Sequence, residues 1–476
     1  MAIATLREFL DDLEKEGQLL RIKDEVSLEP DLGAAARAIN NVGKDTAPAL
    51  LFEKLHGYHD ARIAMNVHGS WNNHALMLGI PKDTPLKEQF FEFVRRYQTY
   101  PGKVEFRDSA PWQEVVVDDP EKINLFDVLP LFRLNRNDGG FYIDKSCVIS
   151  RDLDDPDNFE KQNLGVYRLQ VKGRNRIGIQ PIPAHDIAIH LRHAEERGED
   201  LPIAIAISND PIMNLVAAMP ILYDQSEYEM AAALQGSPYP VVHSDFSGVD
   251  IPWSSEVVLE GVIRSRVREM EGPFGEFTGH YSGARRMPAV EITRLSYRKN
   301  PLFEHLYLGM PWTEIDYLMG LNTSTPLYVQ LKQNFPEIVA VNALYTHGLV
   351  VIVSTKLRYG GFAKAVGMRV LTTPHGLGYA KVVIVVDDTI DPFNLNQVMW
   401  ALSTKMHPGH DLVVVPDLSV LPLDPGSSPV GITHKVIIDA TTPIPPETRG
   451  HYDQPLDTPM GTEEWEKKLK EMLNAK

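Results

Sequence analysis

The sequence contains a single cysteine, Cys147, among 476 residues, so no intrachain disulfide can form. Such a chain suits a reducing compartment. The N-terminus lacks the basic start and the apolar run of a signal peptide. No window offers the roughly 18 uninterrupted apolar residues that a membrane helix needs. We therefore expect a cytoplasmic protein without a membrane partner.

Positive charge is scarce as well. The chain has 47 Lys and Arg residues against 64 Asp and Glu residues, which gives a formal net charge of −17. An acidic protein repels the phosphate backbone of nucleic acids, so nucleic acid is not expected as a partner. A small anionic ligand would need a local basic group or a bound cation to overcome the same repulsion.

The common nucleotide-binding and hydrolase motifs are absent. The sequence has no GxxxxGK[ST], no GxSxG and no HExxH, and Gly376-Leu-Gly378 lacks the third glycine of a dinucleotide fingerprint. Three histidines, His185, His190 and His193, gather around the start of a predicted helix. A solvated histidine face is the favoured interpretation. The alternative is the zinc site of a metal-dependent hydrolase.

The length implies two or three domains, because a single core rarely exceeds roughly 250–300 residues. Short β-prone runs separated by Gly, Pro and Asp are typical of an antiparallel sheet or barrel, and near-continuous apolar strands between helices favour a largely parallel sheet. A Pro- and Gly-rich loop is predicted over 416–451. In order, we expect a small α/β region over 1–114, the antiparallel sheet or barrel over 115–308, an α/β domain over 309–455 and an amphipathic helix over 456–476.

The segment Glu271-Gly-Pro-Phe-Gly-Glu-Phe-Thr-Gly-His280 offers a candidate catalytic acid. Its carboxylates, Glu271 and Glu276, lie five positions apart in a stretch whose Gly and Pro residues fix the backbone. A carboxylate between Gly275 and Phe277 can have a raised pKa, because an aromatic ring excludes water, and can then act as a general acid. A surface turn with solvated glutamates is the equally weighted alternative.

Arg168 stands in an otherwise apolar stretch, Gly-Val-Tyr-Arg-Leu-Gln-Val. A charge in such surroundings needs a partner, and Glu271 or Glu276 would supply one. The alternative is an edge-strand arginine whose head group reaches water.

Several stretches together resemble one family. The whole chain resembles the UbiD family of reversible decarboxylases, through Asn163-Leu-Gly-Val-Tyr-Arg168, Ser226-Glu-Tyr228, Glu271-Gly-Pro-Phe-Gly-Glu276 and Arg358-Tyr-Gly-Gly-Phe-Ala-Lys364. It is most similar to the large catalytic C subunits of bacterial non-oxidative hydroxyarylic (phenolic) acid decarboxylases, through Asp224–Met230, Gly275–Gly283 and Leu308–Asp316.

The resemblance implies prenylated FMN as cofactor, with a divalent ion, Mn²⁺ or Mg²⁺, and K⁺ at its phosphate. The implied divalent ligands are Asn163, His185 and Glu227, and two oxygen ligands with one imidazole suit these ions better than zinc. Glu229 is a nearby competitor, but the family pattern of an acid between Ser and Tyr selects Glu227. The implied potassium site comprises Ala217, Met219 and Glu227. The implied cofactor contacts are Asn163, Leu164, Gly165, Val166, Tyr167, Arg168, Ala184, His185 and Lys364.

The resemblance also implies the chemistry. Glu276 would protonate carbon after carbon dioxide leaves, Arg168 would hold the substrate carboxylate and tune Glu276, and Glu271 would orient Arg168. The expected reaction is the reversible non-oxidative decarboxylation of para-hydroxylated benzoates such as 4-hydroxybenzoate, vanillate or protocatechuate. The alternatives are another unsaturated or polyprenyl aromatic acid as substrate, a metal-dependent hydrolase, and a non-catalytic scaffolding subunit.

The implied fold is α/β (α+β), with a central split β-barrel that binds the flavin. A small N-terminal α/β region and a C-terminal α/β domain used in oligomerisation would flank it. The expected partners are a small aromatic carboxylic acid as substrate, further copies of the chain in a homodimer or larger homo-oligomer, a flavin prenyltransferase-like B subunit as cofactor supplier, and a small D subunit.

Overall fold

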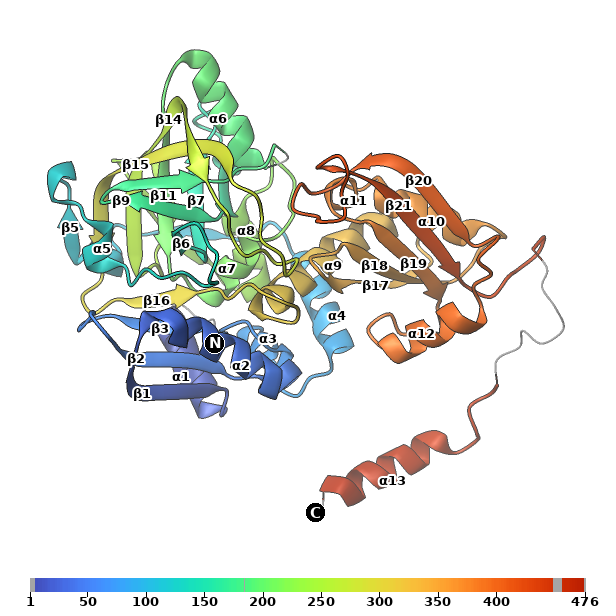
Figure 1. The fold of residues 1–476 in the computed structure, drawn as a ribbon. Helices are drawn as coiled ribbons and strands as arrows, with labels where there is room; N and C mark the ends of the chain where they lie inside the picture. The colour runs from blue at the N-terminus through green and yellow to red at the C-terminus, as the bar shows by residue number, and fades with distance from the viewer. Residues whose placement is uncertain (1–4, 184, 448–455, 475–476) are drawn as a thin grey trace.

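The computed structural model describes residues 5–183, 185–447 and 456–474. Within these ranges, sheets of four, nine, three and five strands are joined and covered by helices (Figure 1). Helices and strands are both substantial, as the expected α/β (α+β) class requires. None of the helices in the described ranges has the length and apolar character that crossing a membrane demands.

The first unit is a four-stranded mixed sheet. Its strands, in spatial order, are β1 (Leu19–Val26), β2 (Ala49–Leu55), β3 (Arg62–Met65) and β16 (Leu302–His305). The helices of this part are α1 (Leu6–Lys15), α2 (Gly33–Gly43), α3 (Trp71–Met77) and α4 (Leu86–Tyr97). Thr5 caps the start of helix α1, because its hydroxyl accepts the N–H of Glu8 at 3.2 Å. Strand β16 comes from far along the sequence and ties this unit to the next.

The second unit is a nine-stranded antiparallel sheet. Its spatial order is β6 (Phe141–Ile143), β9 (Leu169–Gly173), β10 (Arg176–Ile179), β15 (Arg285–Tyr297), β14 (Val257–Glu271), β11 (Leu201–Ile207), β7 (Ser146–Arg151) and β8 (Gln162–Val166), with β5 (Val115–Val117) paired to β15. Strands β8 and β9 lie near opposite ends of this order, yet only Tyr167 and Arg168 separate them in sequence. Since an extended residue spans at most about 3.6 Å, the two ends must curl toward each other. The expected barrel is confirmed as a curled half-barrel.

Short elements surround this sheet. The helices are α5 (Leu125–Val128), α6 (Asp186–Arg197), α7 (Pro211–Val216) and α8 (Glu227–Gln235), and a three-stranded sheet has the order β13 (Val249–Pro252), β12 (Tyr239–Ser244) and β4 (Val104–Phe106). Helices α6 and α8 both matter for the site, because each begins at a residue that the family resemblance implies as a metal ligand. His185 is the N-cap of α6 and Glu227 is the first residue of α8.

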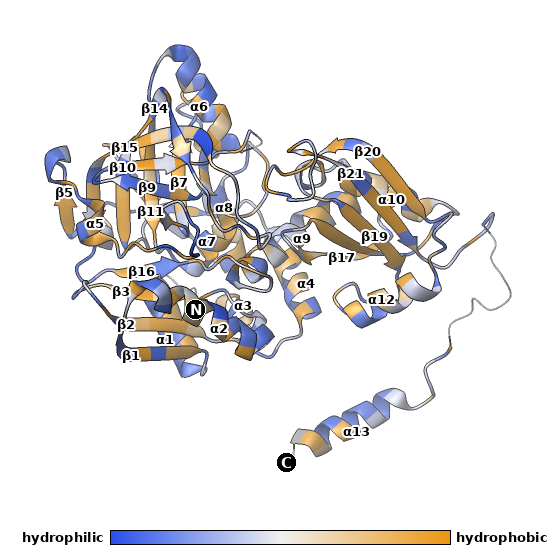
Figure 2. Ribbon diagram, in the orientation of Figure 1, coloured by the Kyte–Doolittle hydropathy of each residue, from blue (hydrophilic) through white to orange (hydrophobic). Residues whose placement is uncertain are grey.

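The third unit is a five-stranded sheet that follows the long helix α9 (Glu314–Asn334). Its order is β17 (Ile338–Tyr345), β18 (Val350–Thr355), β19 (Val382–Asp387), β21 (Ile432–Ala440) and β20 (Leu412–Ser419), with helices α10 (Phe362–Leu371), α11 (Pro374–Gly378) and α12 (Leu395–Thr404). Figure 2 shows that β17 and β19 are hydrophobic along most of their length. The expectation of a largely parallel sheet is wrong in part: β18–β19 and β19–β21 are parallel, but β17–β18 and β20–β21 are antiparallel.

The prediction of a loop over 416–451 is wrong in part, because Ile432–Ala440 form strand β21. It lies inside the sheet, between β19 and β20. Its buried positions include the polar residues Thr433, Lys435 and Asp439, so its hydrophobic pattern does not alternate cleanly. Lys435 is tolerated there because its ammonium group donates to the carbonyl oxygens of Gly376 at 2.6 Å and Leu377 at 3.1 Å.

The final described helix is α13 (Thr462–Asn474), which falls within the segment expected to form an amphipathic helix. Its apolar side chains, Trp465, Leu469, Met472 and Leu473, are all exposed.

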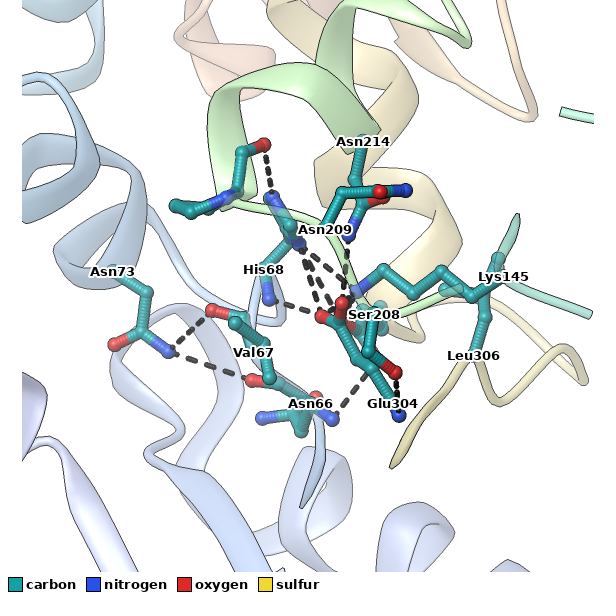
Figure 3. A network of polar contacts seen from close by, with 12 residues as sticks. Asn66, Val67, His68, Asn73, Lys145, Ser208, Asn209, Asn214, Glu304 and Leu306 are labelled. Atoms are coloured by element: carbon teal, nitrogen blue, oxygen red, sulfur yellow. Dashed lines mark hydrogen bonds and ion pairs between the residues drawn. The ribbon is translucent and has the colours of Figure 1, made fainter. Parts of the chain in front are cut away.

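A buried ionic cluster contains residues of all three units; Figure 3 shows His68, Lys145 and Glu304 within it. Its centre is the ammonium of Lys145, which lies 2.5 Å from Glu304 Oε1, 2.6 Å from Glu314 Oε1 and 2.9 Å from His68 Nδ1. The lysine and both glutamates are almost completely buried. His68, Glu304 and Glu314 have the mutual spacing of metal ligands, but here the ammonium group serves as the cation.

The same cluster extends into the backbone. Glu314 accepts the N–H groups of Asn66 and His68, both at 2.9 Å, and Glu304 accepts the side-chain amide of Asn214 on α7 at 2.7 Å. Burial alone would raise the pKa of Glu314, but the charge of Lys145 and hydrogen bonds from His68 lower it to about 2. Because Glu314 begins α9 and Asn214 lies in α7, the cluster fixes two helices whose ends or sides face the site.

Candidate active site

A cavity of about 570 Å³ lies between the curled central sheet and the C-terminal unit. Its size is that of a pocket for a small organic ligand. The central unit contributes β8, the residues that follow it, and the loop after β14. The opposite wall comes from α9 and from the loops and helix α11 of the C-terminal sheet. Most of the lining is apolar, and many of the polar side chains fall into a few groups.

The first group is the predicted set of Arg168, Glu271 and Glu276. The guanidinium of Arg168 donates Nε–H to Glu271 Oε1 at 3.0 Å and Nη2–H to Glu271 Oε2 at 2.7 Å. Its Nη1 donates to Glu276 Oε1 and to Ser282 Oγ, the latter at 2.8 Å. Arg168 and Glu276 line the cavity, whereas Glu271 is fully buried behind them. The bidentate pair with Glu271 fixes the plane of the guanidinium and presents Nη1 to Glu276.

The backbone after β14 explains why the sequence can place Glu276 inside. Gly272 has φ +93° and a Cβ there would lie 2.9 Å from the carbonyl oxygen of Gly283, so only glycine fits. Gly275 donates its N–H to the buried carboxylate of Asp138 at 2.8 Å. Glu276 then closes a tight turn, donating its N–H to the carbonyl of His280 at 2.9 Å. The alternative of a solvated surface turn is therefore wrong for this segment.

The electrostatics of this group favour a carboxylic acid at neutral pH. Burial raises the pKa of Glu276, the positive charge of Arg168 opposes that effect, and the resulting pKa is about 7. The pKa of Arg168 is raised despite burial, because Glu276 and Glu271 stabilise its charge. Glu276 can thus carry a proton beside a permanent cation, and Phe274, whose ring lies 5.4 Å from the guanidinium carbon, covers the pair.

The second group is Asn163, His185 and Glu227, all of which line the same cavity. Glu227 is buried and its Oε2 has no hydrogen-bond partner among the described residues. Burial, together with the charge of the nearby Asp186, raises the pKa of Glu227 well above its ordinary value. Burial likewise lowers the pKa of His185 to about 4, so its imidazole is neutral. A buried carboxylate with one unpartnered oxygen, a neutral imidazole and an amide oxygen fit a divalent cation.

Residues 164–167, which the family resemblance implies as cofactor contacts, line the cavity between these two groups. A Cβ on Gly165 would lie 2.6 Å from the hydroxyl of Tyr167, so this strand passes close beneath the tyrosine. Val166 donates its N–H to the carbonyl of Ala217 at 3.1 Å. Ala217 and Met219, the residues expected at a potassium site, both line the cavity, and each carbonyl retains a lone pair for a cation.

The structure does not bring every predicted residue to the cavity. Ala184 lies outside the described residues. Lys364 is not among the residues that line the cavity; it lies on α10 of the C-terminal unit.

The three histidines around the start of α6 do not form one site. Only His185 lines the cavity. His190 is buried and shares a 2.9 Å hydrogen bond with Ser150, and His193 pairs with Asp152 at 2.8 Å. The solvated histidine face is therefore wrong for His190.

A third polar group was not predicted. His347, His375 and Tyr379 line the cavity from the C-terminal unit. The rings of His375 and Tyr379 are stacked at 4.7 Å, and His347 meets both edge-on. No spacing rule joins these residues, because they come from the β17–β18 turn, from the start of α11 and from the residue that follows α11.

Comparisons with known proteins agree over the whole chain. Family models of 3-octaprenyl-4-hydroxybenzoate carboxy-lyase match its N-terminal domain to residues 10–92, its Rift-related domain to 103–311 and its C-terminal domain to 316–440. The phenolic acid decarboxylase of Bacillus subtilis (strain 168) is 67% identical over 475 residues, with 100% of both chains covered.

Solved structures give the same result. The vanillic acid decarboxylase of Sedimentibacter hydroxybenzoicus (ShVdcCD) in its closed form has a TM-score of 0.93 at 55% identity, covering 99% of both chains. An evolved dimeric form of the UbiD-class enzyme HmfF from Pelotomaculum thermopropionicum, in complex with prFMN, has a TM-score of 0.81 at 28% identity, covering 97% of this chain and 98% of that one. The three family models and the full-length relative show that this chain belongs to the UbiD family of carboxy-lyases.

Proposed function

We propose that this protein decarboxylates para-hydroxylated benzoates, of the 4-hydroxybenzoate, vanillate or protocatechuate type, to the phenol and carbon dioxide, and that the reaction is reversible. The observation that supports this most is the buried Arg168–Glu276 pair, which offers a cation for a carboxylate and an acid whose pKa is about 7 in one cavity. The relatives described as phenolic acid and vanillic acid decarboxylases support the substrate class.

The cofactor in this proposal is prenylated FMN, which the HmfF structure contains. Asn163, His185 and Glu227 would hold Mn²⁺ or Mg²⁺ at its phosphate, and the carbonyls of Ala217 and Met219 with Glu227 would hold K⁺. Two cations would allow a chain of net charge −17 to bind a phosphate. Prenylated FMN, when bound, supplies an electrophilic centre that accepts the electron pair of the departing carboxylate.

The residues of the chain then have separate tasks. Arg168 orients the substrate carboxylate, and Glu271 holds the guanidinium in place. The apolar lining of the cavity excludes water and favours loss of charge as carbon dioxide leaves. Glu276 donates its proton to the ring carbon that lost the carboxylate and regains a proton from solvent, so each turnover consumes one proton.

The size of the cavity bears on the alternative substrates. A volume of about 570 Å³ must accommodate the cofactor as well as the substrate, which favours a single-ring acid over a polyprenyl aromatic acid. The test is a panel given to holoenzyme made with a flavin prenyltransferase. We expect turnover of hydroxybenzoates and none of cinnamate or a polyprenyl hydroxybenzoate; the reverse order would contradict the proposed substrate class.

The rate should depend on pH through Glu276. Its raised pKa of about 7 means that the proton-donating form prevails below pH 7 and is lost as the pH rises through 7. Where proton transfer limits the rate, kcat should fall about tenfold per pH unit above this value. Measuring kcat from pH 5.5 to 9 checks this. A constant kcat across pH 6–9 would remove Glu276 from the limiting step.

Replacing Glu227 by glutamine should weaken retention of both the divalent ion and the flavin, because the variant loses one ligand charge. A tenfold or larger loss of affinity is expected, equivalent to about 1.4 kcal/mol. Metal analysis and the flavin absorbance after gel filtration measure it. The matched control is Glu229→Gln on the same helix, because Glu229 hydrogen-bonds Tyr100 at 3.1 Å and does not line the cavity. Equal losses in both variants would contradict the assignment.

The proposal extends to assembly. The Sedimentibacter enzyme is described as ShVdcCD, and one of its open-form structures has a truncated ShVdcD. We propose a corresponding small D subunit for this chain, a flavin prenyltransferase-like B subunit as cofactor supplier, and a homodimer or larger homo-oligomer. The exposed apolar face of α13 supports an interaction with another chain.

A further inference from the structure

The wall of the cavity that faces Arg168 and Glu276 contains a histidine to which the chemistry above gives no task. His347 lies in the turn between β17 and β18 and lines the cavity. Its ring centroid is 5.6 Å from that of Phe277, the residue that follows Glu276. His347 therefore contributes to the C-terminal side of the same cavity that Glu276 and Phe277 line.

The turn holds His347 in an uncommon backbone conformation. Thr346, His347 and Gly348 have φ values of +50°, +53° and +72°, three consecutive left-handed residues. Such values are costly for a β-branched residue like Thr346, and costly conformations persist where the surroundings fix them. Gly348 is required for a further reason, since a Cβ there would lie 2.4 Å from Nε2 of His375. The turn thus brings His347 and His375 together at the cavity wall.

Two ring contacts hold the imidazole of His347 in place, but one of its nitrogens lacks a hydrogen-bond partner among the described residues. It packs edge-on against His375 at 5.7 Å and against Tyr379 at 4.6 Å. Its Nδ1 is buried without a hydrogen-bond partner among the described residues. Burial, together with His375 and His185, lowers the pKa of His347 well below its ordinary value, so the imidazole is neutral. Because Nδ1 is enclosed, Nε2 is the ring nitrogen that a ligand in the cavity would meet.

We propose that Nε2 of His347 hydrogen-bonds the phenolic oxygen of the substrate and thereby selects acids with a para-hydroxyl group. The inference rests on the proposed function, because it assumes that the carboxylate lies at Arg168. A para-substituent points directly away from the carboxylate across the ring, toward the opposite wall. Either tautomer suffices: a protonated Nε2 donates to the oxygen, and an unprotonated Nε2 accepts from the hydroxyl.

The test uses two sulfonates, which cannot lose carbon dioxide and therefore report binding alone. 4-Hydroxybenzenesulfonate and 4-methylbenzenesulfonate differ only at the para position. Wild-type holoenzyme should bind the hydroxyl compound roughly 10- to 100-fold more tightly, the effect of one hydrogen bond in a closed site. In His347→Phe this ratio should fall to about 1, while His347→Gln, which keeps a polar group, should retain part of it. Isothermal titration measures both dissociation constants.

A matched control lies in the same cavity. Gln330 on α9 lines the cavity and its Oε1 is also buried without a partner among the described residues, so Gln330→Leu should leave the ratio unchanged. A preference that persists in His347→Phe, or that disappears in Gln330→Leu instead, would overturn the inference. Loss of bound flavin from His347→Phe would also overturn it, because His347 would then contact the cofactor. Because neither ligand reacts, failure of the decarboxylase proposal would appear separately, as absent turnover of hydroxybenzoates.

Discussion

Glu276→Gln should lower kcat for 4-hydroxybenzoate by roughly 10²- to 10⁴-fold, the usual contribution of a general acid, while the flavin stays bound. Glutamine keeps the shape of the side chain and its carbonyl can still accept from Arg168, but it has no acidic proton to give to carbon. The variant should therefore keep its flavin absorbance and its substrate affinity and lose the protonation step. Steady-state kinetics, with the absorbance spectrum as the check on loading, measure this.

Glu269→Gln is the matched control for that experiment. Glu269 lies on the same strand, β14, two residues before Glu271, and pairs with Arg176 away from the cavity. It should retain the wild-type kcat. Full activity in Glu276→Gln would show that another group protonates the ring. A loss of flavin from Glu276→Gln would assign the glutamate to cofactor binding.

Lys145→Met should destabilise the fold by about 3–5 kcal/mol, the cost of leaving buried charges without their partner. Methionine fills a similar volume, but the carboxylates of Glu304 and Glu314 would then face each other. Their side chains are only 0% and 1% exposed. At least one would have to bind a proton at neutral pH. The midpoint of urea denaturation, followed by fluorescence, should fall accordingly.

Two companion variants separate charge from packing. Lys15→Met removes an exposed lysine that pairs with Asp12 at 2.7 Å, and such a surface pair contributes at most about 1 kcal/mol. Adding Glu314→Gln to Lys145→Met should recover part of the lost stability, because one of the two unpaired carboxylates becomes neutral. A denaturation midpoint for Lys145→Met equal to that of Lys15→Met would show that the cluster does not hold the three units together.

Arg168, Glu271 and Glu276 illustrate how much the sequence could reveal. Local chemistry offered a buried ion pair as one of two interpretations, beside a solvated turn and an edge-strand arginine, and the structure joins the residues across 103 and 108 positions. Asn163, His185 and Glu227 are different, because they stand 22 and 42 residues apart and have no local signal. Family resemblance alone predicted these three as ligands, and the curled sheet and two helix starts explain how they reach one cavity.

Other features could not be predicted because polar residues occupy buried positions. Strand β21 buries Thr433, Lys435 and Asp439, which a hydrophobic pattern counts as exposed. Lys145, Glu304 and Glu314 likewise become a cluster only after three separate segments pack together. His347 depends on a left-handed turn, which single-residue preferences disfavour for threonine and histidine.

The central claim is that this chain decarboxylates a para-hydroxylated benzoate with a bound prenylated flavin. The most direct test gives 4-hydroxybenzoate to purified holoenzyme in D₂O and measures phenol, carbon dioxide and the position of deuterium. We expect phenol and carbon dioxide in equal amounts, with one deuterium at the carbon that lost the carboxylate. Flavin-loaded, metal-replete protein that turns over neither 4-hydroxybenzoate nor vanillate nor protocatechuate would contradict it.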